Sequence, residues 1–152
     1  MGSIHSESVL SVFNLVRDAI LASDVLSKKF ETKMIVQFEP KHKSRGFSGF
    51  PYFWVNIPEA TPEKLVFDNS LVNEELSCTV ILRMDWEARD NYLSYANAFL
   101  KAIADYESTF ESAGYYDVMP RLIDTNPNQT IEEKQVVEGE FSLDWHGHVR
   151  RD

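Results

Sequence analysis

Apolar residues recur at helical spacing in two stretches of the chain. In residues 8–23 they lie three or four positions apart and share one helical face: Val9, Phe13, Val16 and Ile20. Either Ser6 or Ser8 is placed to cap this helix. A longer stripe over residues 87–112 is rich in aromatic side chains: Tyr92, Tyr95, Ala96, Phe99, Ile103, Tyr106 and Phe110. Gly114 follows where a left-handed residue ends a helix, so the pattern predicts two amphipathic helices.

Alternation of apolar and polar residues predicts strands between and after these helices. The predicted strands cover residues 33–39, 50–57, 64–67, 75–86, 115–123 and 135–145. In the first of them, Met34, Val36 and Phe38 share one side. The polar stretches 41–49 and 124–130, with their glycines and Asn-Pro-Asn, are predicted loops.

The order of these elements indicates the fold class. Successive strands with no helix between them form antiparallel pairs. We therefore expect an α+β fold, a mostly antiparallel sheet with two amphipathic helices packed on one face. The 152 residues are predicted to form a single domain, residues 1–152, in which residues 1–7 and 147–152 are flexible tails.

The predicted strand over residues 50–57 is unusually aromatic. Tyr52, Phe53 and Trp54 are adjacent, and they cannot all face the helix side of a sheet. Two explanations fit equally well. Either a neighbouring subunit covers the second face of the sheet, or the core is locally thick and the strand is bulged.

The net charge of the chain argues against two classes of partner. It has 24 acidic and 15 basic residues, a formal net charge of −9. This balance argues against a protein that coats nucleic acid and against docking on an anionic membrane. No apolar run approaches the ~20 residues that span a bilayer, and the first residues form no signal-peptide core. With one cysteine there is no intrachain disulfide, and we expect the protein in the cytoplasm of the cell that makes it.

The sequence carries no motif for nucleotide binding or hydrolysis, and we predict no catalytic residues, no cofactor and no metal. Cys78 lies among apolar residues of an alternating strand, which predicts a buried structural thiol. His146 and His148 would share a strand face, with Asp144 and Asp152 nearby. A small metal-binding protein or hydrolase that uses them stays open as an alternative, although zinc sites usually have three or four protein ligands.

A basic segment stands out in this acidic chain. Lys41, Lys43 and Arg45 surround His42 in the first predicted loop. Contact with an acidic patch on a partner subunit, contact with phosphate and a plain solvated loop all fit this pattern.

The order of elements and several short phrases resemble the tail terminator (tail completion) proteins of long-tailed bacterial and archaeal viruses. The resemblance covers residues 8–146 and begins with the opening amphipathic helix. Its phrases are Phe50-Pro51-Tyr52-Phe53-Trp54-Val55-Asn56-Ile57, then Cys78-Thr79-Val80-Ile81-Leu82-Arg83 running into a long helix, and Glu140-Phe141-Ser142-Leu143-Asp144-Trp145. The chain departs from the family pattern in residues 61–75 and in its His-rich end.

The resemblance implies a structural virion protein without enzymatic activity. Such a subunit forms a homohexameric ring at the tail–neck junction, made in the host cytoplasm. The ring caps the tail tube, joins it to the head-proximal neck or connector, and lets DNA pass through its lumen without specific binding, which a net negative charge suits. Another neck or tail-tube subunit and a host adaptor domain remain alternatives.

The resemblance, together with the aromatic strand, also indicates where subunits would meet. In this family extended loops reach the neighbouring subunits, and the matching segments here are residues 41–49 and 124–134. The residues predicted to lie at the subunit interface are Lys41, Lys43, Arg45, Phe47, Tyr52, Trp54, Asn126 and Asn128.

Overall fold

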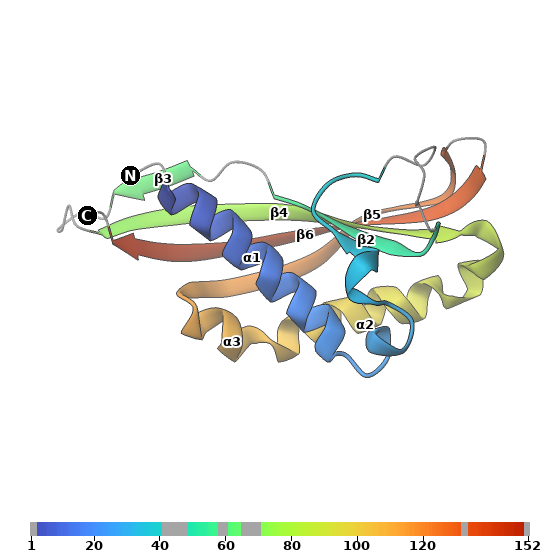
Figure 1. The fold of residues 1–152 in the computed structure, drawn as a ribbon, viewed down its shortest axis with the longest axis horizontal. Coiled ribbons are helices and arrows are strands. Elements are labelled where there is room, and N and C mark those ends of the chain that lie inside the picture. The colour runs from blue at the N-terminus through green and yellow to red at the C-terminus, as the bar shows by residue number, and fades with distance from the viewer. Residues whose placement is uncertain (1–2, 41–48, 58–60, 65–70, 132–133, 151–152) are drawn as a thin grey trace.

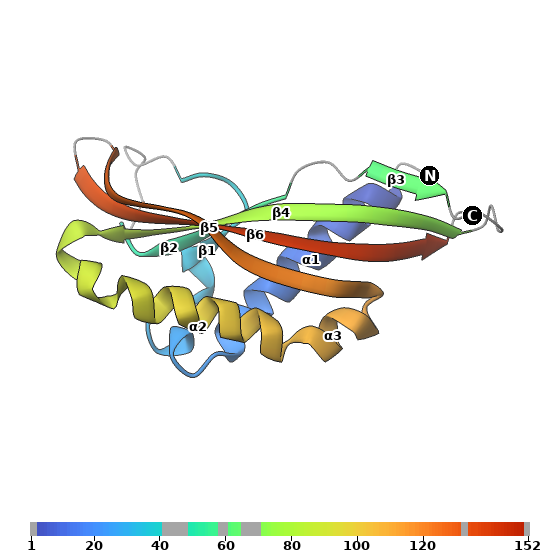
Figure 2. The ribbon, with the colours of Figure 1, turned by 180° about the vertical axis from the view of Figure 1, so that it is seen from behind.

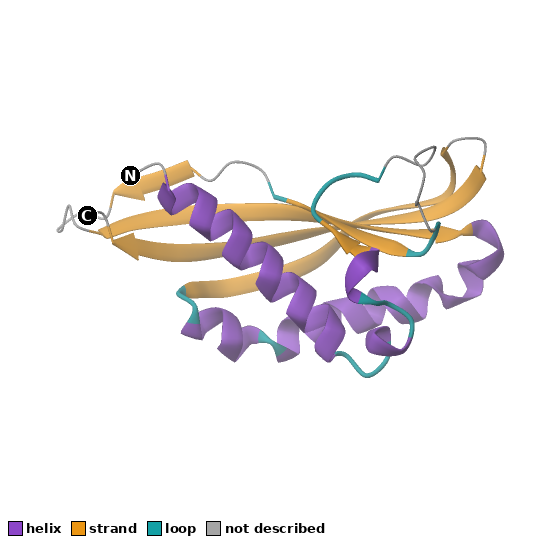
Figure 3. Cartoon of the chain, viewed as in Figure 1, coloured by secondary structure: helices purple, strands orange, loops and turns teal. Residues whose placement is uncertain are grey.

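The structure, a computed structural model, describes residues 3–40, 49–57, 61–64, 71–131 and 134–150. The helices form one layer beneath a long twisted sheet whose strands run along the longest axis of the molecule (Figures 1 and 3). In the described part of the chain, no helix lies on the opposite face of the sheet. We call this opposite side the open face.

The helical layer consists of α1 (Ser3–Ala22), α2 (Tyr92–Asp105) and α3 (Glu107–Ser112). Three short 3-10 helices accompany them, at Leu26–Lys28, Thr32–Met34 and Trp86–Asn91. Both predicted amphipathic helices are present. Gly114 has a φ of 93° and donates its N–H to the Glu111 carbonyl at 2.9 Å, as expected of a left-handed residue that ends a helix.

The strands are β1 (Ile35–Val36), β2 (Tyr52–Asn56), β3 (Thr61–Lys64), β4 (Leu71–Asp85), β5 (Tyr115–Ile131) and β6 (Lys134–Arg150). Their order across the sheet is β1-β2-β4-β6-β5, and β3 pairs with β4 beyond the end of β2. Only β1 and β2 run parallel; the other pairs are antiparallel. The predicted class is therefore confirmed: an α+β fold, a mostly antiparallel sheet with helices packed on one face.

Alternate strand residues form the core between the sheet and the helices. On β4 these are the even-numbered residues Cys78, Val80, Leu82 and Met84, all buried. On β6 they are the residues predicted to share a face, Val137, Phe141, Leu143 and Trp145. Phe99 of α2 lies at the centre, with its ring centroid 5.4 Å from that of Phe53 and 4.7 Å from that of Phe141. These contacts join α2 to both sides of β4.

Gly139 lies in the same core face of β6, directly beneath α2. A Cβ atom at this position would lie 2.4 Å from the Tyr92 hydroxyl oxygen. The absence of a side chain leaves room for Tyr92, whose hydroxyl shares a 2.9 Å hydrogen bond with the Thr125 hydroxyl of β5. One glycine thus allows the first turn of α2 to reach across β6 to β5.

The second predicted helix is not continuous. Residues 86–91 form a 3-10 helix, and Tyr106 interrupts the α-helical run between α2 and α3. The predicted stripe is nevertheless correct, because Tyr92, Ala96, Phe99, Ile103 and Phe110 are all buried. The interruption turns the chain so that α3 packs against β5 (Figure 2).

The predicted strand over residues 33–39 is wrong for most of its length. Only Ile35 and Val36 pair as a strand, and Met34 ends a 3-10 helix. Ile35 is the buried residue of this segment, whereas Phe38, predicted to share one side with Met34 and Val36, is 77% exposed. The 3-10 turn shifts the alternation by one residue, which reverses the side that faces the core.

The predicted loop over residues 124–130 is also wrong, because β5 continues through it to Ile131. Three register shifts against β6 absorb the irregular residues, and one of them lies between Asn126 and Gln129, around Pro127. A bulge lets a proline occupy an edge strand without a missing ladder bond. At the chain ends, α1 begins at Ser3 and β6 runs to Arg150, so regular structure extends into both predicted tails.

Candidate interaction surfaces

A buried charge lies on the open face of the sheet. Arg83 of β4 is 7% exposed although no helix covers this side, and it is the only buried charged residue in the described part of the chain. Its Nε donates to Glu138 Oε2 at 2.7 Å, and its Nη1 donates to the Tyr52 hydroxyl at 2.9 Å. Glu39, three residues after β1, completes the group with an ion pair to Arg83 at 3.5 Å. We call these four residues the Arg83 cluster.

The Arg83 cluster joins three neighbouring strands and one loop. Tyr52 and Glu138 are the register partners of Arg83 on β2 and β6. The guanidinium also lies near the Tyr52 and Trp54 rings, 5.9 and 5.5 Å from their centroids. Such cation–π contacts add to the hydrogen bonds where the cation is shielded from water. The cluster therefore stabilises the centre of the open face.

The pKa values in the cluster follow from this arrangement. Burial of Arg83 acts to lower its pKa, but hydrogen bonds to Tyr52 and Glu138 outweigh burial, and the pKa is raised. For Tyr52, burial raises the pKa, and this effect is larger than the lowering caused by the adjacent Arg83 guanidinium. Both shifts keep the arginine charged and the phenol neutral. Proton transfer between these groups is disfavoured, and the cluster has the properties of a structural ion network.

The cluster explains the aromatic strand. Phe53 points into the helix-side core, while Tyr52 and Trp54 point to the open face. Tyr52 is 2% exposed within the single chain. Arg83 covers it, and its ring stacks on that of Phe50 with the ring centroids 5.5 Å apart. The chain itself thus supplies the second cover at Tyr52, which presents no surface to a neighbour. Trp54 is half-buried, so part of its ring stays accessible.

Among the described residues, the edge strand β5 has more exposed large apolar side chains than any other element. Seven large hydrophobic residues are exposed in that part of the chain, and four of them belong to β5: Tyr116, Met119, Leu122 and Ile123. Met119 is the most exposed of the four, at 59%. By register, Tyr116 and Met119 lie on the open face, opposite His146 and Asp144, and Leu122 lies on the helix side, opposite Phe141. We call these four exposed residues of the edge strand, on both of its faces, the β5 patch. Because β5 ends the sheet order, no strand of this chain pairs along its outer side in the described structure.

The backbone of β5 is not suited to extending the sheet. Pro120 has no N–H to donate, Asp117 has a φ of 58°, and register shifts follow Tyr116 and Leu122. Bulges and prolines of this kind interrupt the regular ladder that a new strand would need. The β5 patch can therefore contact a partner through its side chains but not by continuous strand pairing.

Another exposed apolar residue, Phe38, lies on the other side of the molecule. Phe38 follows β1, which ends the sheet order opposite to β5. Figures 1 and 2 show the arrangement: α1 and the β1–β2 side face the viewer in the first, and β5, α2 and α3 face the viewer in the second. Glu39 is held by Arg83, so the residue next to Phe38 is anchored to the sheet.

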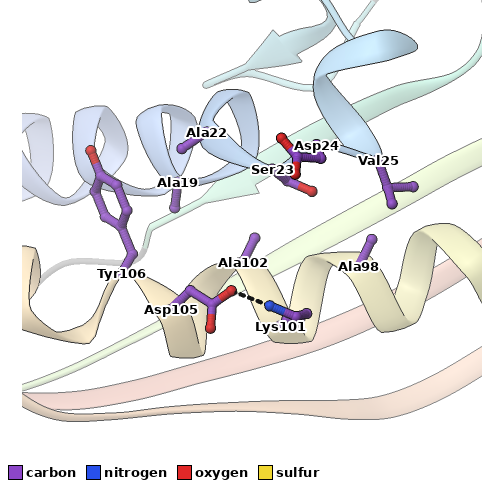
Figure 4. Close-up of a pocket in the computed structure, with 10 residues that line it drawn as sticks. All are labelled: Ala19, Ala22, Ser23, Asp24, Val25, Ala98, Lys101, Ala102, Asp105 and Tyr106. Atoms are coloured by element: carbon purple, nitrogen blue, oxygen red, sulfur yellow. Dashed lines mark hydrogen bonds and ion pairs between the residues drawn. The ribbon is translucent and has the colours of Figure 1, made fainter.

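A pocket of about 360 Å³ lies between the end of α1 and the middle of α2 (Figure 4). Its walls are mostly small side chains, and an ion pair between Lys101 and Asp105 lies at its rim. The lining residues are Ala19, Ala22, Ser23, Asp24, Val25, Ala98, Lys101, Ala102, Asp105 and Tyr106. No cysteine or histidine is among them. Its two aspartates lie apart in the chain, Asp24 in the turn after α1 and Asp105 at the end of α2.

The other residues considered for chemistry are buried or separate. Cys78 is buried as predicted, and burial, with a smaller contribution from Asp144, raises the pKa of its thiol far above the usual range. His146 and His148 pair along the backbone with Glu75 and Asn73 of β4. Within the described ranges, no group of three or more potential ligands is placed to hold a metal ion.

Only some of the predicted interface residues lie in the described part of the chain. Lys41, Lys43, Arg45 and Phe47 lie outside the described residues. Asn126 is half-buried in β5, and the backbone of Asn128 belongs to the same strand. The β5 patch could not be predicted from the sequence, because residues 115–123 show no clean alternation of apolar and polar residues. The burial of Arg83 could not be predicted either, because a polar residue that alternates with apolar residues on a strand normally faces water.

No protein-family model matches the sequence, and no curated protein is significantly similar to it. None of the helices in the described ranges combines the length and apolar character needed to cross a membrane.

Proposed function

We propose that this protein is a structural virion subunit of the tail-terminator type, which assembles into a ring that caps the tail tube and joins it to the neck. The observation that carries the assembly part of this proposal is the β5 patch. A folded chain that exposes four large apolar side chains on one edge strand gains free energy when other surfaces cover them. The described surface offers no comparable feature for catalysis.

The element order supports the terminator type. An opening amphipathic helix, a strand with Tyr52 and Trp54, and a long strand running into the second helical segment follow the pattern that resembles this family. β4 and β6 are long, with 15 and 17 residues, and they pair over the whole length of β4. Long paired strands suit a ring wall, because each subunit must hold the same angle to its neighbours for the ring to close.

The net charge of −9 is consistent with a channel through which DNA slides. A lumen of like charge to the phosphate backbone does not retain it. The same charge helps to keep separate rings apart in solution.

Introducing charge into the β5 patch is expected to abolish assembly. We expect the wild-type protein to sediment as an oligomer and the Met119→Glu/Ile123→Glu double variant to sediment with the mass of one chain, 17.5 kDa. Both side chains are exposed, so the variant should keep the wild-type circular dichroism spectrum. Burying two carboxylates in an apolar contact costs far more than the contact contributes.

Leu93→Glu is the matched control, since Leu93 is also exposed but belongs to α2 and not to β5. This variant should remain assembled. A wild-type protein that sediments as a single chain at every concentration would contradict the proposal, and so would a double variant that assembles like the wild type.

A further inference from the structure

We infer that the pocket between α1 and α2 binds a small organic cation, a primary alkylammonium whose charged end meets Asp24 and whose short apolar chain lies against alanine side chains. This ligand site goes beyond the proposed assembly and does not depend on it. The shape of the pocket, the charges at its rim and the end of α1 all point to this class of ligand.

The pocket has the size and the lining of a site for a small ligand. Its volume of about 360 Å³ lies at the lower end of the range for small-molecule sites. In Figure 4, Ala19 points from α1 toward α2, and Ala98 and Ala102 point from α2 toward α1. Together with Ala22 we call these the pocket alanines. Their methyl groups suit a short hydrocarbon chain, because contact between the two removes apolar surface from water.

The charged residues that line the pocket leave an excess of one negative charge. Asp24 lies on the α1 side and Asp105 on α2, and Lys101 is the single lysine or arginine in the lining. Lys101 forms its ion pair with Asp105. The hydrogen bond to Asp105 and, to a smaller extent, the charge of Asp24 raise the pKa of Lys101, so the lysine stays charged. Lys28 and Lys29 follow in the chain, but neither lines the pocket.

Asp24 is the carboxylate that a ligand can reach. It is exposed, and within the described ranges its carboxylate forms no hydrogen bond or ion pair, whereas Asp105 is already bonded to Lys101. The turn that carries Asp24 is held by a 3.2 Å hydrogen bond, which the Leu26 N–H donates to the Ser23 hydroxyl. A binding group on a restrained turn loses less conformational entropy when the ligand arrives.

The end of α1 adds to the negative potential of the pocket. Ala19 and Ala22, in the last turn of α1, are among the lining residues, and this turn contains no basic residue. Backbone carbonyls at the C-terminus of a helix carry a partial negative charge, which favours a cation nearby. Asp24 follows Ala22 by two residues, so its carboxylate and the helix end attract a cation together.

Other classes of ligand fit this arrangement less well. An anion would be repelled by Asp24 and by the end of α1. A neutral apolar molecule would shield the Asp24 carboxylate from water without offering it a partner, which is costly. A metal ion of the calcium or magnesium type takes six or more oxygen ligands, and the lining has two carboxylates, one of them paired with Lys101.

Methyl NMR of protein labelled with ¹³C at its alanine methyl groups tests the site, because the lining itself carries the reporters and the method also suits an assembled ring. The protein is titrated with n-butylammonium chloride at constant ionic strength. We expect saturable shifts in the signals of the pocket alanines, whereas the signals of Ala88 and Ala113, which do not line the pocket, stay unchanged. Sodium butyrate, which has a similar size and the opposite charge, should produce no such shifts.

Two substitutions identify the charge that holds the ligand. Asp24→Asn removes an exposed carboxylate, and the butylammonium concentration at half-saturation should rise several-fold. Lys101→Met frees Asp105 for the ligand, so the concentration at half-saturation should fall. Asp90→Asn is the matched control, because Asp90 is exposed and does not line the pocket, and it should leave half-saturation unchanged.

Shifts that grow with concentration and never saturate would overturn the inference, and so would an equal response to butyrate. An unchanged half-saturation in Asp24→Asn would also overturn it. Weaker binding in Lys101→Met would do the same, because it would assign the contact to the lysine. Each of these results is independent of the mass of the protein in solution, so a failure of this inference is distinct from a failure of the proposed function.

Discussion

Replacement of Phe99 by alanine is expected to lower the free energy of unfolding by about 3–5 kcal/mol, the usual cost of emptying a buried phenylalanine site. The Phe99 ring is fully buried and contacts Phe53 of β2 and Phe141 of β6. These strands lie on either side of β4 and cannot both move inward to fill the cavity. The loss is a large part of the roughly 5–15 kcal/mol that stabilises a typical domain.

Urea denaturation of wild type and variant at one protein concentration measures this effect. Leu93→Ala, on the same helix but exposed, should change stability by no more than about 0.5 kcal/mol. If Phe99→Ala were as mild as Leu93→Ala, the position of α2 on the sheet would be wrong.

Replacement of Arg83 by methionine is expected to cost about 2–3 kcal/mol. The change leaves the Glu138 carboxylate without its 2.7 Å donor and removes a hydrogen bond from the Tyr52 hydroxyl. Loss of one member of a fully buried ion pair costs roughly 3–5 kcal/mol. The value expected here is smaller because Glu138 keeps some contact with water and Glu39 is half-exposed.

Arg121→Met provides a matched control for this prediction. Arg121 forms an ion pair of similar length, 2.9 Å, with Asp144 on the same face of the sheet. Both side chains of this pair are well exposed, Arg121 at 63% and Asp144 at 44%, so the loss of Arg121 should cost less than about 1 kcal/mol. Equal effects of the two substitutions would show that Arg83 is solvated and that the cluster does not organise the open face.

Much of the fold follows from local pattern. The stripe of α2, the alternation of β4 and the opening helix were predictable because the same residues that set the period also form the core. The end of the second helical segment at Gly114 was predictable because a left-handed residue favours glycine.

The errors arise where pairing between distant segments overrides local signals. Asn126-Pro127-Asn128 has the composition of a turn, yet β6 holds it in a strand through a register shift. Phe38 looks like a core residue until the 3-10 turn at Thr32–Met34 changes its side. Arg83 becomes recognisable as a buried cation only when β2 and β6 bring Tyr52 and Glu138 beside it.

The mass of the purified protein in solution tests the central claim, that this chain assembles with itself into a closed ring. Light scattering after size exclusion, over a wide range of concentrations, is the direct measurement. The account predicts one discrete species near six times 17.5 kDa, whose mass does not change with concentration. A mass of 17.5 kDa at every concentration, or a mass that grows steadily as an open filament would, contradicts it.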